Sequence, residues 1–197
     1  MNGLRVTYIS DGIIAYSGTP AASSFDVVVL ITGDQYLTDM RADGQQAIVN
    51  AQQLYGTGVV MTEWAAFLVL DNKWQFLSQL LLAKRVEGTT SNITFSLTLN
   101  THPIWNDLPS VFTSKVSMSI SELSSVSNEA QVVANAMGFE RGGPGVIIKS
   151  DNGTAGRLVQ IAHSAHHTTN NGIFNWANDN NITMMMVNAV RWAAKLI

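Results

Sequence analysis

The sequence predicts an α/β protein: a three-layer, mostly parallel, doubly wound sheet with antiparallel additions in the middle and C-terminal half. In the first part of the chain, short apolar runs rich in β-branched residues alternate with amphipathic stretches. The middle instead alternates apolar residues with Ser and Thr. The first pattern is typical of parallel strands joined by helices, and the second of antiparallel strands with one exposed face.

The N-terminal part predicts three strands and two helices. Strands are expected at 4–9, 26–32 and 59–62, and the run 26–32 is continuously apolar, as in a strand buried on both faces. A helix is predicted over 42–55, where Gly56 and Gly58 end it. Its apolar residues share one face: Ala47, Ile48, Ala51, Leu54 and Tyr55. The stretch 64–84 is predicted to be mostly helical.

The rest of the chain predicts strands followed by one helix. The turn Asp151-Asn-Gly153 predicts a hairpin, and Asn180 or Asn181 is a suitable N-cap for the last helix. That helix carries an apolar stripe at Ile182, Met185, Met186, Ala189, Val190 and Ala193. The expected strands lie at 89–99, 115–123, 131–137, 145–149 and 157–162.

Composition narrows the class of protein. The 197 residues are 46% hydrophobic and only 13% charged, with net charge −3, and they show no linker, so residues 1–197 are expected to form one globular domain. The sequence has no Lys/Arg cluster of the kind that would predict nucleic-acid binding. It also has no apolar run long enough for a membrane span. There is no cysteine, which excludes disulfides and thiol nucleophiles. Without a visible signal peptide, a cytoplasmic location is expected.

Four segments, in this order, resemble the class I glutamine amidotransferase-like superfamily, and most of all its trehalose-utilisation (ThuA-like) branch. They are Phe25-Asp-Val-Val-Val-Leu, Gly58-Val-Val-Met-Thr-Glu-Trp, Thr101-His-Pro-Ile-Trp-Asn-Asp-Leu-Pro, and Gly143-Pro-Gly-Val with Gly156-Arg-Leu-Val-Gln-Ile-Ala-His. The closing Val187-Asn-Ala-Val-Arg-Trp-Ala-Ala resembles the branch's terminal helix. The resemblance implies a flavodoxin-like fold and a bacterial protein.

The chain also departs from that family. Where the amidotransferases keep a nucleophilic cysteine at a strand-to-helix turn, this sequence has Thr62-Glu63-Trp64, so glutaminase chemistry is excluded. His163 falls where the family's catalytic histidine follows its strand, but the Pro-Glu that often comes next is absent. The family usually has a strand and a helix before a segment like 4–9. The resemblance therefore implies either that this chain has lost them or that they lie on a part not included in this sequence, and a sheet without that strand would expose an edge unless something covers it.

Glu63 and His163 are the candidate catalytic residues, because both follow predicted strands at their C-terminal ends, where open α/β sheets build sites. Glu63 is interpreted as a general acid or base whose pKa an apolar neighbour raises, and His163 as its partner. The alternatives are a Glu that interacts with the helix dipole and a loop histidine bonded to backbone and water.

Asp34, Trp64, His166 and His167 are the candidate ligand-binding residues. His163 with His166 or His167, and Glu63 or Asp34, would match the ligand types of a zinc or iron site, but a loop is the better interpretation of this stretch, so no metal or cofactor is predicted. Trp64 could stack on a sugar ring together with Trp105, Trp176 and Tyr36. His102 is interpreted as structural, with Ile104 and Trp105 filling the core.

Three functions remain open. The first is a non-catalytic domain that binds a small ligand, such as a carbohydrate, in the crevice at the strand C-termini. The second is a ThuA-like carbohydrate-active enzyme with Glu63 and His163 as its acid–base pair. The third is a structural module of a larger assembly, a function that an apolar interface along 4–9 would support. Association into a homo-oligomer is compatible with each of the three.

Overall fold

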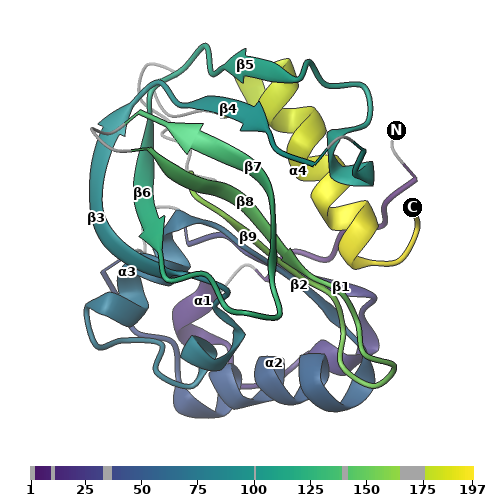
Figure 1. The fold of residues 1–197 in the computed structure, drawn as a ribbon. Coiled ribbons are helices and arrows are strands. Elements are labelled where there is room, and N and C mark those ends of the chain that lie inside the picture. Colours follow the sequence, from purple (N-terminus) through teal and green to yellow (C-terminus); the bar gives the residue numbers. More distant parts are fainter. Residues whose placement is uncertain (1–2, 10–11, 33–36, 100, 139–141, 165–175) are drawn as a thin grey trace.

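The computed structural model describes residues 3–9, 12–32, 37–99, 101–138, 142–164 and 176–197. They form an α/β fold in which α4 (Asn180–Ala193) covers one face of a seven-stranded sheet, while α2 (Ala42–Tyr55) and α3 (Glu63–Leu70) lie beyond the other face (Figure 1). No helix in these ranges is both long and apolar enough to cross a membrane.

The large sheet has the strand order β1-β2-β9-β8-β7-β4-β5. In the described ranges, parallel pairing is confined to β1 with β2 and β2 with β9, so the parallel part is smaller than predicted. β9 pairs antiparallel with β8, and the antiparallel order continues to β5. The strands are β1 (Val27–Leu30), β2 (Gly58–Met61), β4 (Thr94–Leu97), β5 (Val111–Thr113), β7 (Gln131–Met137), β8 (Gly143–Lys149) and β9 (Leu158–Ile161).

A second sheet pairs β3 (Lys84–Ser91) with β6 (Met118–Ser124) in antiparallel register. Both strands pack against α3, so this small sheet stands beside the C-terminal end of β2. The end of β9 also meets β6, because the amide of Ser121 donates to the carbonyl of Ala162 at 2.8 Å and Ile120 bridges His163. The small sheet thus reaches the strand ends where the candidate site was predicted.

The helices follow their sequence signals in part. α2 has the predicted bounds, and Gly56 ends it with a left-handed φ of 76°. Its apolar face was only partly predicted, because Leu54 and Tyr55 in the last turn are exposed. The expectation that 64–84 is mostly helical is confirmed only in part: α3 stops at Leu70, and a 3₁₀ turn, η3 (Leu77–Leu80), leads into β3. The remaining short elements are α1 (Gly12–Ala15), η1 (Ala22–Ser24), η4 (Pro103–Trp105) and η5 (Trp176–Asn178).

The strand predicted at 4–9 is not formed. Residues 3–9 have no regular secondary structure, and Val6 and Tyr8 are 82% and 83% exposed. A strand is stable only when its backbone groups pair, and β1 is the last strand on this side of the described sheet. The apolar alternation of this segment is therefore not enough to form a strand: residues 4–9 pair with no ladder, and the outer edge of β1 stays open in the described sheet.

The core lies between the large sheet and its helices, and α4 approaches β2 without intervening side chains. Most of the predicted stripe of α4 is buried, including Ile182, Met185 and Ala189. A Cβ at Gly58 would lie 2.3 Å from the carbonyl oxygen of Ala193, so only glycine fits there. The predicted N-cap was wrong by one or two positions: Asp179 caps α4, with Oδ1 accepting from the amides of Asn181 and Ile182.

Replacing Gly58 with Ala is therefore expected to lower the free energy of unfolding by about 1–3 kcal/mol, the usual cost of forcing an extra methyl group into a packed interior. Urea denaturation of the variant and the wild type measures the difference. A variant as stable as the wild type would show that α4 does not lie this close to β2.

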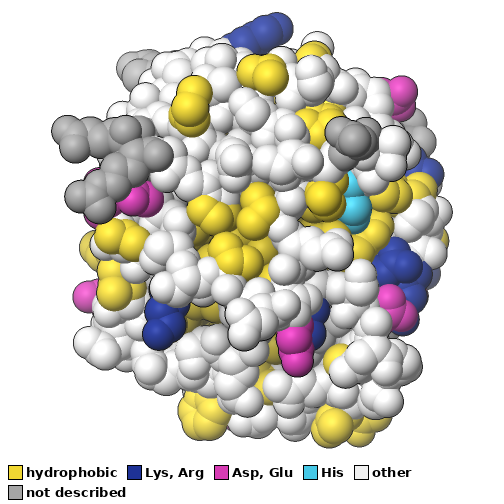
Figure 2. Space-filling model, viewed as in Figure 1, with side chains coloured by type: hydrophobic (Ala, Val, Ile, Leu, Met, Phe, Trp, Pro, Cys, Tyr) yellow, Lys and Arg dark blue, Asp and Glu magenta, His cyan; other side chains and the backbone are white. Residues whose placement is uncertain are grey.

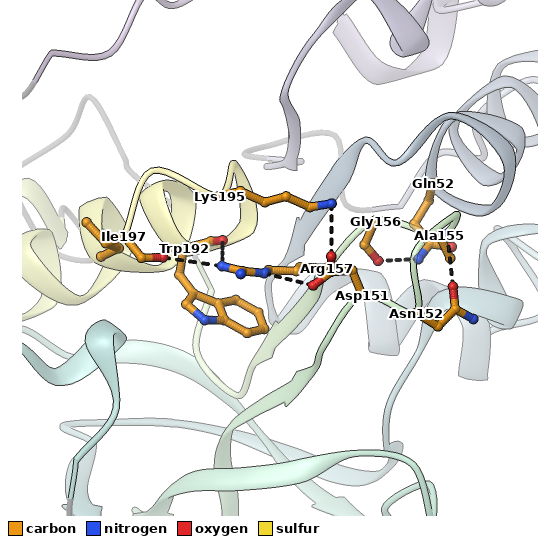
Figure 3. A network of polar contacts seen from close by, with 9 residues as sticks. All are labelled: Gln52, Asp151, Asn152, Ala155, Gly156, Arg157, Trp192, Lys195 and Ile197. Atoms are coloured by element: carbon orange, nitrogen blue, oxygen red, sulfur yellow. Dashed lines mark hydrogen bonds and ion pairs between the residues drawn. The ribbon is translucent and has the colours of Figure 1, made fainter.

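One polar cluster holds the end of the chain against the β8–β9 hairpin, the hairpin predicted at Asp151–Gly153 (Figure 3). Arg157 lies with its guanidinium over the ring of Trp192 and donates to the carbonyls of Trp192 and Ile197 at 2.8 and 3.3 Å. Asp151 pairs with both Arg157 and Lys195, at 3.2 and 3.0 Å. Hydrogen bonds to both partners lower the pKa of Asp151. We call Asp151, Arg157, Trp192, Lys195 and Ile197 the C-terminal cluster.

The surface is weakly charged, as the composition predicts. On the face shown in Figure 2, Lys, Arg, Asp and Glu side chains are scattered among polar and backbone atoms, with hydrophobic side chains grouped over the middle of the large sheet. This face shows no basic tract, the feature that nucleic-acid binding needs.

Candidate functional site

Glu63 lies at the start of α3, directly after β2, and its residue is 1% exposed. Its Oε1 accepts a hydrogen bond from the hydroxyl of Ser121 at 3.0 Å and lies 3.3 Å from Nε of Arg85. Nε of Arg85 also donates to the Ser121 hydroxyl at 2.9 Å, which closes a three-residue contact. We call Glu63, Arg85 and Ser121 the carboxylate cluster. It joins α3 to both strands of the small sheet.

The carboxylate cluster leaves Glu63 with an unusual acidity. Burial raises the pKa of Glu63 from 4.5 to about 7, against the opposing effects of Arg85 and Ser121. Its second oxygen, Oε2, is buried and has no hydrogen-bond partner within the described ranges. A carboxyl group in this state can donate or accept a proton near neutral pH, and it has one oxygen free to bind another group.

Arg85 is held in place from several sides. Its guanidinium lies 5.0 Å from the centroid of the Phe67 ring, a cation–π contact. A Cβ at Gly88 would lie 1.9 Å from one of the guanidinium nitrogens, so this glycine leaves the space that Arg85 occupies. These contacts hold the guanidinium beside Glu63, with Nε shared between Glu63 and Ser121.

His163 follows β9 and is fully buried, on the opposite side of the sheet from the carboxylate cluster. Its ring packs edge-on against Phe95 at 5.9 Å, and Nδ1 lies 2.7 Å from the carbonyl oxygen of Ser164. Because a carbonyl only accepts, Nδ1 carries the proton and Nε2 keeps a lone pair. Nε2 has no hydrogen-bond partner among the described residues. Burial lowers the pKa of His163 to about 4, against the effects of Ser164 and Asp179, so the ring is neutral near pH 7.

The structure joins Glu63 and His163 through the backbone and separates their side chains. The amide of Glu63 donates to the carbonyl of His163 at 3.0 Å. Gln160, whose side chain reaches Leu82 and Ala83 near α3, marks the face of β9 that looks toward the carboxylate cluster. Three residues further along an extended strand, His163 points to the other face. A direct proton transfer between the two side chains does not fit this arrangement.

Two hydroxyls lie near Glu63 without partners. Thr32 and Ser164 are buried, and neither hydroxyl has a hydrogen-bond partner in the described parts of the chain. Thr32 follows β1 and Ser164 follows β9, and the pairing of Leu30 with Met61 and of Met61 with Gln160 sets both on the Glu63 face. Buried polar groups are nearly always bonded, so unpartnered ones at neighbouring strand ends are typical of a site that takes a ligand or water.

Thr32 and Thr62 form a matched pair that tests this interpretation. Thr62 is equally buried, but its hydroxyl donates to the carbonyl of Leu30 at 3.3 Å. Thr62→Val is expected to lower the free energy of unfolding by about 0.5–1.5 kcal/mol, whereas Thr32→Val is expected to leave it unchanged or to raise it. Urea denaturation of both variants without ligand measures this. An equal loss for Thr32→Val would mean that its hydroxyl is bonded after all.

Other residues predicted for the site lie elsewhere or outside the described ranges. Asp34, Tyr36, His166 and His167 are not among the described residues, and of Trp176 only the backbone is described. Trp64 is half-buried at the start of α3 and packs edge-on against Phe67 at 5.5 Å. Trp105 is in the core, so the predicted group of sugar-stacking rings is not brought together by the described residues.

His102 has the structural role expected of it. Its Nδ1 accepts from the amide of Ile104, and its ring packs against Trp192. Ile104 and Trp105 are buried, as predicted. Within the described ranges, no group of three His, Asp or Glu side chains could hold a metal ion.

Two surface hollows, of about 300 and 530 Å³, lie away from these strand ends. The larger is lined by residues that precede β1, β2 and β9, and the smaller by the start of β7 and the end of β8. Neither is lined by Glu63 or His163. The candidate site is therefore a set of buried groups at the strand ends.

Arg85 and Ser121 were not predicted from the sequence. They lie far along the chain from Glu63, and only the pairing of β3 with β6 brings them together. A weak signal was present: Gly88 interrupts a strand pattern, and a strand glycine often marks a close approach. Asp179, whose charge opposes the lowering of the His163 pKa by burial, was not predicted either, because the N-cap was expected one or two residues later.

Solved structures with this fold include ThuA-like proteins. The chain aligns with one from Bacteroides uniformis at a TM-score of 0.65 and 14% identity, over 93% of this chain and 75% of that one. A ThuA-like protein from Parabacteroides merdae gives a TM-score of 0.67 at 15% identity, over 87% and 71% of the two chains. A cytoplasmic protein from Salmonella typhimurium gives 0.61 at 13% identity, over 87% and 73%.

No protein-family model and no curated protein matches the sequence. The structural likeness therefore establishes the fold that this chain shares with ThuA-like proteins.

Proposed function

We propose that this chain is a ligand-binding domain of the amidotransferase-like fold, without glutaminase activity. Its site lies at the C-terminal ends of β1, β2 and β9 and takes a small neutral ligand rich in hydroxyl groups, the chemistry of a carbohydrate. The observation that carries the proposal is the free oxygen of buried Glu63 beside the unpartnered hydroxyls of Thr32 and Ser164.

The ligand class follows from what these groups can bond. Both hydroxyls donate and accept, and Oε2 of Glu63 accepts when ionised and donates when protonated. A sugar hydroxyl can complement either role. The cation of the site, Arg85, is already paired with Glu63, so an anionic ligand would bury a second negative charge without a partner.

Thermal-shift measurements test the proposal with glucose and mannitol as neutral probes, and with gluconate and glucose 6-phosphate as anionic ones. A neutral probe should raise the melting temperature of the wild type and of Thr62→Val, but not of Thr32→Val or Glu63→Gln. If the neutral probes stabilise no protein, or stabilise all four proteins equally, the proposed site is wrong. Stabilisation by the anions alone would overturn the ligand class.

A second candidate function is a carbohydrate-active enzyme in which Glu63 is the general acid or base. The observation in its favour is the pKa of Glu63 near 7, which populates both protonation states under neutral conditions. His163 fits this role less well, because a pKa near 4 makes it a weak base and its side chain faces away from Glu63. An enzyme of this kind would turn over nitrophenyl glycosides at a rate that changes with pH near 7. This change should be absent in Glu63→Gln.

A further inference from the structure

The loop between β8 and β9 carries an Asn-Gly pair in an exposed and unhindered position. Asn152, Gly153 and Thr154 are all exposed. Gly153 has a φ of +95°, and no atom lies within 4 Å of the place a Cβ would take. The backbone amide of Gly153 is therefore open on the side where other residues carry a side chain that shields it.

The side chain of Asn152 is oriented within the same turn. Its Oδ1 accepts a hydrogen bond from the amide of Ala155 at 3.0 Å, which fixes the carboxamide over the turn and polarises its carbonyl (Figure 3). Two other asparagines are also held by their amide nitrogen: Nδ2 of Asn92 donates to the carbonyl of Ser114 while its Oδ1 accepts from the Ser117 hydroxyl, and Nδ2 of Asn188 donates to two carbonyls. Neither of these is followed by glycine.

We propose that Asn152 is a site of spontaneous covalent modification in the folded protein. Solvent hydroxide removes the proton from the amide nitrogen of Gly153, which attacks Cγ of Asn152 so that a C–N bond forms. The Cγ–Nδ2 bond then breaks, and Nδ2 takes up a proton from water and leaves as ammonia. Water then opens the resulting succinimide at either carbonyl, which yields aspartate or isoaspartate. The step needs no oxidant, reductant or cofactor.

The modification acts on the C-terminal cluster, because Asp151 is the neighbouring residue (Figure 3). Isoaspartate inserts an additional backbone atom between Asp151 and Gly153. The other end of the loop is held in place and cannot shift to make room for the additional atom. The amide of Gly156 donates to the carbonyl of Gln52 at 2.7 Å, and Nε2 of Gln52 donates to the carbonyl of Gly156 at 2.6 Å. Asp151 must then shift relative to Arg157 and Lys195, which loosens the end of the chain.

The native chain, incubated for days at about pH 8 and mapped by mass spectrometry, tests the proposal. Aspartate and isoaspartate are expected at position 152, more slowly at about pH 6, with Asn92 and Asn188 intact and with no reaction at that position in Asn152→Gln. If Asn152 stays intact until the protein is unfolded in urea, the modification does not belong to the folded state and the proposal is wrong.

Hydrogen exchange tests the link to the C-terminal cluster. Aged protein should exchange faster than fresh protein over 192–197, whereas Asn152→Asp, which adds the charge without lengthening the backbone, should match fresh protein. Unchanged exchange in aged protein that carries isoaspartate would contradict the link.

Discussion

Glu63→Gln is expected to stabilise the protein by about 3 kcal/mol at about pH 8 and to change its stability little near pH 4. The native carboxyl titrates at about 7 and the unfolded one near 4.5, and each pKa unit corresponds to about 1.4 kcal/mol. Between these values the native state keeps a proton that the unfolded state has released, so stability is lost as the pH rises from about 4.5 to 7. Glutamine resembles the protonated form and does not titrate.

Urea denaturation at both pH values measures this effect. The matched control is Glu129→Gln, since Glu129 is exposed, paired with Lys149, and has its pKa lowered by that partner. The control should gain no stability at high pH. If Glu63→Gln is less stable than the wild type at about pH 8, the attraction of Arg85 outweighs the cost of burying the ionised carboxylate, and the pKa of Glu63 is not raised in the native state.

His163→Phe is expected to remove a pH dependence of stability that is opposite in sign to that of Glu63, namely a loss of stability as the pH falls. The native imidazole titrates at about 4 and the unfolded one near 6.5, so the unfolded state gains a proton first as the pH falls. The wild type therefore loses about 3 kcal/mol from this group between about pH 6.5 and 4. Phenylalanine keeps a ring against Phe95 and cannot titrate, although it loses the bond to the Ser164 carbonyl.

The measurement is the change in unfolding free energy between about pH 6.5 and 4, in the wild type and in three variants. Because the windows of Glu63 and His163 overlap and their signs differ, the two contributions largely cancel in the wild type. Glu63→Gln alone should become less stable toward acid, His163→Phe alone should become more stable, and the double variant should show neither contribution. If His163→Phe keeps the dependence of the wild type, His163 is not buried in its neutral form.

The fold was predictable where sequence periodicity reports burial directly. The bounds of α2 and β7 follow from spacing alone, and so does the α/β class. The predictions for 4–9 and 64–84 were wrong or only partly right because hydrophobic spacing alone does not fix the secondary structure that a segment takes. Residues 3–9 form no strand although the edge of β1 is open, and α3 ends at Leu70, with the 3₁₀ turn η3 before β3 begins at Lys84.

The location of the candidate site was predictable from the sequence, but the side-chain contacts within it were not. The sequence places Glu63 and His163 after neighbouring strands, and the structure brings their backbones within one hydrogen bond. Which face each side chain takes depends on where a strand gives way to a helix. Glu63 is already the first residue of α3, whereas His163 still follows the alternation of β9. No local pattern predicts that difference.

Gln160 shows what one polar side chain in the middle of a sheet controls. Its Oε1 accepts from the amides of Leu82 and Ala83, and its Nε2 donates to the carbonyl of Ala83. Leu82 and Ala83 come directly before β3. The side-chain amide of Gln160 therefore fixes where β3 begins and where Arg85 lies along the small sheet. A leucine at this position would have a similar volume and would suit the apolar core better. It would leave three backbone groups without hydrogen bonds, however, and the position of β3 would no longer be fixed. The acidity of Glu63 is thus tuned from a neighbouring strand, by a residue that never touches it.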